Sequence, residues 1–92
     1  MGRRCQRHIH GKPDVLIFKP AGIQRTHLEE IVLGLDEYEA LRLCDIEKLT
    51  MQEGADKMKI SSATFNRLVQ SVHTKVANAL VYGKVIRIEN VL

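Results

Sequence analysis

The feature that most constrains this chain is a regular apolar stripe near its C-terminus. Between Phe65 and Leu80, apolar side chains recur at intervals of three and four residues, which places them on one face of an α-helix. Ser61 is a favourable N-cap before the stripe, and Gly83 is a favourable stop after it. The sequence therefore predicts one long amphipathic helix against a core, with a stripe made of Phe65, Leu68, Val69, Val72, Val76, Ala79 and Leu80.

A second, shorter helix is predicted directly before the long one. Thr50 is an N-cap residue, and Glu53 follows three positions later, which is the spacing of a capping box. The apolar pattern ends near Met58, and a short connection leads to Ser61. A short helix, a tight turn and a long helix form a helix-turn-helix, whose core we place at residues 50–82.

The residues around the turn suit two crossing helices. Ala55 is expected at the crossing, with Gly54 beside it, because a branched side chain there would hold the helices apart. Phe65 is expected to be the buried anchor of the second helix. Lys59 occupies the turn position that usually carries glycine, and a left-handed backbone there costs a non-glycine residue roughly 1 kcal/mol or somewhat more. The motif is slightly weakened but not broken.

Further elements are expected on the N-terminal side and after Gly83. Asp36 is expected to cap a helix that runs to about residue 48. Residues 15–18 and 85–88 are predicted strands, and their pairing with each other is a hypothesis. Residues 28–33 fit either a short strand or the lead-in to a helix. The predicted fold is mainly α: a helix-turn-helix DNA-binding domain of three helices, with a small β element formed by the N- and C-terminal segments.

Charge is distributed unevenly along the chain. Residues 1–25 hold six basic and one acidic side chain, residues 26–60 four basic and nine acidic, and residues 61–92 four basic and one acidic. The two basic ends would suit a polyanionic partner such as a nucleic acid. The acidic middle is then expected to face away from that partner. Many small proteins have uneven charge without binding nucleic acid, so charge alone does not decide the function.

Several functional classes are disfavoured. No apolar run approaches the ~20 residues that a membrane span needs, and no signal peptide is recognisable, so we expect a cytoplasmic protein with no membrane partner. We expect neither an enzyme nor a cofactor, since there is no Gly-rich phosphate loop, nucleophile motif or metalloprotease motif. Cys5 and Cys44 do not resemble a disulfide framework, and Cys44 is expected to be a small core residue.

At this point the residues resemble known proteins. The segment TMQEGADKMKIS at residues 50–61 is similar to the DNA-binding helix-turn-helix in region four of bacterial sigma factors. Most of the chain resembles a small prokaryotic family of predicted DNA-binding proteins, domain of unknown function 134. The matching segments are FKPAG from residue 18, LEEIVL from 28, DEYEALRL from 36 and ANALVYGK from 77. This resemblance implies a helix-turn-helix fold and DNA binding, without a known target.

Helix geometry identifies the side of the long helix that would face DNA. Opposite the apolar stripe lie Ala63, Asn66, Arg67 and Gln70, followed by Thr74 and flanked by Thr64 and Ser71. Arginine can make two hydrogen bonds to guanine, and asparagine or glutamine can make two to adenine. We therefore expect base readout from Asn66, Arg67 and Gln70, with Ala63 on the same face. The alternative is that these side chains form an ordinary solvent-exposed polar face without a binding role.

Phosphate contacts are expected around the starts of the two helices. Helix N-termini and small hydroxyl side chains commonly position a protein on the DNA backbone. The expected residues are Thr50, Ser61, Ser62, Thr64 and Lys75. Related families often place a basic residue where Ser62 and Ala63 stand, so strong base contacts from these two positions are doubtful.

The basic N-terminal segment is a second candidate for DNA contact. Residues 1–14 lack periodicity and are expected to form a flexible arm before a single domain at residues 15–92. Arg3, Arg4 and Arg7 could follow the DNA backbone or enter an adjacent minor groove. A solubilising tail is the alternative.

The same segment contains metal-ligand residue types. Cys5, His8 and His10 supply possible zinc ligands in a short span. A structural zinc site needs a fourth ligand, and His27 or His73 would serve only if the fold brought it close. We expect no metal site.

Three functions remain in competition. The leading one is a transcriptional regulator that reads duplex DNA in the major groove as a homodimer, because one recognition helix reads only a few base pairs. The second is a protein-interaction module that contacts RNA polymerase or a partner regulator through the acidic segment 29–45. The third is a metal or redox sensor built on Cys5, His8 and His10.

Overall fold

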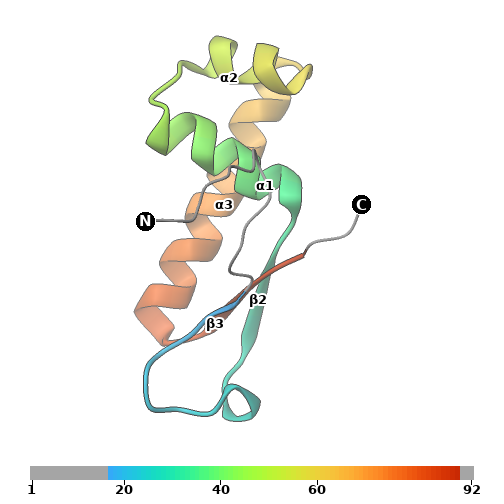
Figure 1. Ribbon diagram of the computed structural model, residues 1–92. Coiled ribbons are helices and arrows are strands. Elements are labelled where there is room, and N and C mark those ends of the chain that lie inside the picture. Colours follow the sequence, from blue (N-terminus) through green and yellow to red (C-terminus); the bar gives the residue numbers. More distant parts are fainter. Residues whose placement is uncertain (1–16, 90–92) are drawn as a thin grey trace, which may run out of the picture.

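A computed structural model of the chain describes residues 17–89 (Figure 1). The expected class, mainly helical with a small sheet, is confirmed. The predicted arm at residues 1–14, with Arg3, Arg4 and Arg7 and with Cys5, His8 and His10, lies outside the described residues. In chain order the elements are β1 (Ile17–Phe18), the 3-10 turn η1 (Arg25–His27), β2 (Glu30–Leu33), α1 (Leu35–Leu41), the π-helical turn η2 (Arg42–Ile46), α2 (Met51–Met58), α3 (Ser62–Tyr82) and β3 (Val85–Ile88).

The long helix α3 is the element against which α1, α2, β2 and β3 pack (Figure 1). It has 21 residues and is therefore about 31 Å long. Phe65, Val69, Val72 and Ala79 are buried, as the apolar stripe predicts. The inclusion of Leu80 in that stripe is wrong, since its side chain is 76% exposed. Each residue turns about 100° around a helix, so Ala79 faces the core while Leu80 points to the side of it.

The predicted caps at the ends of α2 and α3 are confirmed. At the start of α2, the Thr50 hydroxyl accepts a hydrogen bond from the Glu53 N–H (3.1 Å), and the Glu53 carboxylate accepts one from the Thr50 N–H (2.8 Å). The Ser61 hydroxyl accepts the Thr64 N–H (3.1 Å). Gly83 ends α3 with a left-handed φ of 67°. Local sequence alone therefore locates the start of α2 and both ends of α3.

The expected start and end of the first helix need correction. Asp36 is not the N-cap, because Gly34 holds that position and the helix begins at Leu35. The Gly34 N–H donates to the Glu37 carboxylate (3.0 Å). The side chain that caps the start of this helix is therefore Glu37 and not Asp36. The helix ends in a π-helical turn at Ile46, two residues earlier than expected, and residue 48 already has a left-handed φ of 61°.

The sheet has the order β1-β3-β2, with β3 in the centre. The hypothesised pairing of the terminal strands is confirmed: β1 and β3 are antiparallel, with Ile17 opposite Arg87. The ambiguous segment 28–33 contains β2, which pairs with β3 in parallel and places Leu33 beside Ile88. Parallel neighbours need a long crossover, and here the crossover contains all three helices.

Buried side chains form two clusters along α3. The first joins α2 and the first half of α3 to α1 and η2, and Cys44 packs against it half-buried as a free thiol. Burial raises the pKa of that thiol. The second joins the middle of α3 to the sheet. The first cluster contains Ala40, Leu43, Ala55, Phe65 and Val69, and the second contains Leu33, Val72 and Ile88. Within residues 17–89, no helix is both long and apolar enough to cross a membrane.

Candidate nucleic-acid interface

The helices α2 and α3 pack closely against each other. Ala55 and Phe65 are fully buried. Gly54 lies against the Phe65 ring, so that a Cβ on Gly54 would be 2.6 Å from Cε2 and 2.8 Å from Cε1. These distances are shorter than an ordinary carbon contact of about 3.5–4.0 Å. The contact therefore leaves no room for a larger side chain at Gly54.

The turn between the helices has the expected left-handed backbone. Lys59 has a φ of 61° and a ψ of 44°, and its N–H donates to the carbonyl oxygens of Ala55 and Asp56. The next N–H, that of Ile60, also donates to the Ala55 oxygen (3.0 Å). The turn thus tolerates a lysine at a position that favours glycine, and it fixes the direction in which α3 leaves α2.

The four residues expected at the bases share one open side of α3. Ala63, Asn66, Arg67 and Gln70 are all exposed. Asn66, Arg67 and Gln70 form no side-chain hydrogen bond with another residue in the described range. Their hydrogen-bonding groups are therefore available on a rigid helix.

The hydroxyl groups that were expected to contact phosphates form hydrogen bonds within the protein. Ser61 Oγ donates to Thr64 Oγ1 (2.9 Å), while Ser62 Oγ donates to Gln52 Oε1 (2.7 Å) and so ties α3 to α2. The Thr50 hydroxyl caps α2. The first backbone N–H groups of a helix have no partner inside the helix. At α3 this leaves the N–H groups of Ser62 and Ala63 without a partner among residues 17–89, so they can bind an anion.

Lys75 does not lie with this group. Its ammonium donates to the Val32 carbonyl oxygen and to Glu37 Oε1, both at 2.9 Å, on the side of α3 that meets β2 and α1. Glu37 is only 8% exposed and also accepts a hydrogen bond from the Ser71 hydroxyl. Burial raises the pKa of Glu37, but the hydrogen bonds from Ser71, Gly34 and Lys75 outweigh it and hold the pKa below the ordinary value.

Sequence reasoning assigned no DNA contact to three lysines that lie just before α2, within it or in the turn that follows it. Lys48, Lys57 and Lys59 are exposed, and none forms an ion pair with any residue from 17 to 89. Lys57 and Lys59 lie at the C-terminal end of α2 and in the turn, close in sequence to the start of α3. Counting charges beside the motif, rather than over long blocks, would have identified them.

The acidic middle of the chain is largely neutralised in the fold. Glu30 is paired with Arg25 (2.5 Å) and Arg87 (3.0 Å), and these hydrogen bonds hold its pKa below the ordinary value. The other pairs of this segment are Glu29 with Lys84, Glu37 with Lys75, Glu39 and Glu47 with Arg42, and Asp45 with His73. The segment therefore presents much less negative charge than its composition indicates.

The histidines in the described range do not build a metal site. His73 Nε2 lies 2.6 Å from Asp45 Oδ2, and His27 is exposed in η1. Within residues 17–89, no three side chains of the metal-ligating kinds come together.

The chain matches, over residues 1–90, the family described as Protein of unknown function DUF134. A UPF0251 protein of Caldanaerobacter subterraneus is 48% identical over 83 residues, which cover 90% of this chain and 70% of that protein. A UPF0251 protein of Prosthecochloris aestuarii is 48% identical over 87 residues, 95% of this chain and 56% of the relative. One from Desulforudis audaxviator is 46% identical over 91 residues, 97% of this chain and 59% of the relative. No solved structure matches the chain. With nearly its whole length matched, the chain belongs to the DUF134 family.

Proposed function

We propose that this protein binds duplex DNA sequence-specifically and acts as a transcriptional regulator, with the N-terminal half of α3 docked in the major groove. The observation that carries the proposal is a set of exposed polar side chains on that half of α3 whose hydrogen-bonding groups are available to a ligand. Asn66, Arg67 and Gln70 are exposed, share one side of α3 and lack partners among the described residues. The major groove, about 12 Å wide, admits one α-helix, and these side-chain types can each bind a base edge with two hydrogen bonds.

The surroundings of this side suit the DNA backbone. The starts of α2 and α3 present helix N-termini, which favour phosphate oxygens. Lys57 and Lys59 supply exposed positive charge close to the start of α3. Ser62 and Gln52 hold the two helices together by a hydrogen bond, which keeps the two N-termini in a fixed relation.

An interaction module that contacts RNA polymerase or another regulator through the segment 29–45 has less support. Most carboxylates of that segment are already paired with basic side chains of this protein. A basic partner surface would have to break these pairs first.

Fluorescence anisotropy tests the proposal, using a duplex selected from a randomised pool and a series of salt concentrations. About 4–6 phosphate contacts predict a slope of log affinity against log salt of roughly −4 to −5. Arg67→Ala is expected to cost about 1–3 kcal/mol on the selected duplex. Arg25→Ala is the matched control, because it removes an exposed arginine from η1, at the other end of the molecule from α2 (Figure 1).

Either of two results would contradict the proposal. One is no binding to any duplex at low salt. The other is binding that Arg67→Ala and Arg25→Ala weaken equally, since that would indicate general charge attraction without readout by α3.

A further inference from the structure

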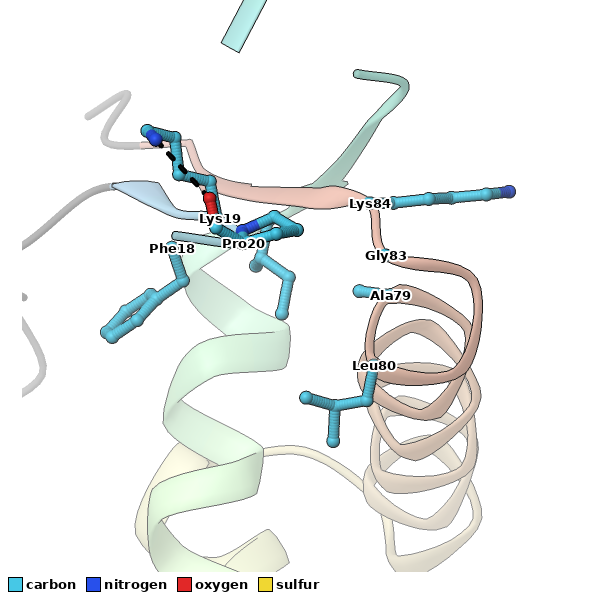
Figure 2. A pocket seen from close by; sticks show the side chains of 8 residues that line it. Phe18, Lys19, Pro20, Ala79, Leu80, Gly83 and Lys84 are labelled. Atoms are coloured by element: carbon cyan, nitrogen blue, oxygen red, sulfur yellow. Dashed lines mark hydrogen bonds between the residues drawn. The ribbon is translucent and has the colours of Figure 1, made fainter. Parts of the chain in front are cut away.

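Apolar side chains lie exposed beside the C-terminal end of α3. Leu80 on α3 is 76% exposed, and Phe18 on β1 is 55% exposed. Figure 2 shows them extending from the two sides of a groove between β1 and the end of α3. The groove has a volume of about 440 Å³, and its lining includes Pro20, Ala79 and Ile86. We refer to Phe18, Leu80 and this groove as the apolar surface.

The apolar surface combines the two features that a contact between identical patches needs. It offers projecting side chains, Phe18 and Leu80, directly beside a recess with mostly apolar walls. In a two-fold interface the same patch is used by both copies, so residue i of one copy meets residue j of the other and the reverse. Leu80 and Phe18 of one copy would then enter the groove of the second, and the second copy would do the same.

We propose that the apolar surface joins two copies of this chain, with the C-terminal halves of their α3 helices side by side and antiparallel. The proposal deepens the proposed function, because it rests on the need for two half-sites in specific DNA binding. It commits to a second copy of the chain as the occupant of the groove.

The direction of Leu80 on α3 favours this occupant. Positions 63, 67, 70 and 74 follow intervals of four and three residues and are all exposed, so they mark the side proposed to face DNA. Position 81 continues that line, and position 80 is turned from it by about 100°. A partner bound beside Leu80 therefore lies next to the base-reading side without covering it. A two-fold axis through that contact turns both base-reading sides toward the same duplex.

The distance along α3 also fits two half-sites. The group Asn66 to Gln70 is centred about 18 Å from Leu80, at 1.5 Å per residue. Two antiparallel copies that meet at Leu80 place their base-reading groups roughly 30–40 Å apart, depending on how the helices cross. Half-sites on one face of DNA are about 34–36 Å apart, one helical turn.

The apolar character and the charge of the surface suit the centre of a dimer interface. A stable interface buries about 800 Å² on each partner and is most apolar at its centre. Phe18 and Leu80 each expose on the order of 100 Å² and would form that centre. The two lysines at its edge already have partners within the chain. Lys84 is paired with Glu29 (3.2 Å), and the Lys19 ammonium donates to the Ile23 carbonyl oxygen (2.7 Å). Figure 2 shows Lys84 pointing away from Phe18 and Leu80.

Sedimentation equilibrium of the full chain tests the proposal. The wild type is expected at twice the chain mass of 10.5 kDa. Leu80→Glu is expected to weaken the dimer by roughly 100-fold or more, since it brings like charges into an apolar contact. Ile46→Glu is the matched control, because Ile46 is an apolar residue that is 73% exposed at the end of η2. It should leave the dimer intact, and unchanged circular dichroism would show that both variants fold.

DNA binding separates this proposal from the proposed function. Leu80→Glu should bind a single half-site as the wild type does, and should lose only the added affinity for two half-sites one turn apart. Arg67→Ala should stay dimeric and lose specific binding. A dimer that binds no DNA would overturn the proposed function and leave the interface standing. A wild type that is monomeric both free and on a two-half-site duplex would overturn the interface, as would a dimer that Ile46→Glu disrupts and Leu80→Glu does not.

Discussion

The contact between Gly54 and Phe65 provides the sharpest test of how α2 and α3 are held together. A Gly54→Ala substitution would place a Cβ 2.6 and 2.8 Å from two ring carbons of Phe65. That is roughly 1 Å inside an ordinary carbon contact. The ring is 0% exposed, so it cannot move outward without disturbing the cluster around Ala55 and Val69.

The expected magnitude follows from two opposing effects. Overpacking a well-filled core costs about 1–3 kcal/mol or more, and a contact with several ring atoms belongs at the upper end. Replacing glycine by alanine inside a helix contributes up to about 1 kcal/mol in the favourable direction. The net loss in the free energy of unfolding should therefore be about 2 kcal/mol. In a domain of this size the melting temperature should fall by about 8–16 °C.

Urea unfolding followed by circular dichroism measures this loss, and a double-mutant cycle shows its cause. Phe65→Leu removes the ring carbons that the new Cβ would meet. In that background Gly54→Ala should cost less than about 0.5 kcal/mol, so the interaction free energy should be close to 2 kcal/mol. A Gly54→Ala protein as stable as the wild type would refute the reasoning. So would an equal cost in both backgrounds.

Two further predictions concern the turn and the buried carboxylate. Lys59→Gly should raise the free energy of unfolding by about 0.5–1 kcal/mol, because glycine accepts the φ of 61° without strain; thermal unfolding that shows a loss would contradict this. Glu37 has a lowered pKa in the folded state, so its contribution to stability is present above the ordinary value of 4.5 and is lost as the pH falls below it. Glu37→Gln should therefore cost about 1–2 kcal/mol at pH 7 and reduce the loss of stability in acid. A variant with the acid profile of the wild type would show that Glu37 is not responsible.

The sequence determined the features of this protein that arise from near neighbours in the chain. The caps at Thr50 and Ser61 and the end at Gly83 involve groups a few residues apart, so residue type and spacing are sufficient to locate them. The apolar period of α3 likewise depends only on the pitch of a helix. The open side with Asn66, Arg67 and Gln70 follows from the same pitch, because it is the face opposite the buried stripe.

Only the tertiary structure decided which distant groups meet. Lys75 fitted a phosphate contact by helix geometry, but the strand that ends at Leu33 brings the Val32 carbonyl and Glu37 to its ammonium. The segment 28–33 had no distinguishing period, and it became a strand because β3 offered a parallel edge. Leu80 fitted the apolar period, yet it is 76% exposed, while the neighbouring Ala79 is buried. Pairings between residues far apart in the chain depend on how the layers stack, and a periodic pattern contains no information about that.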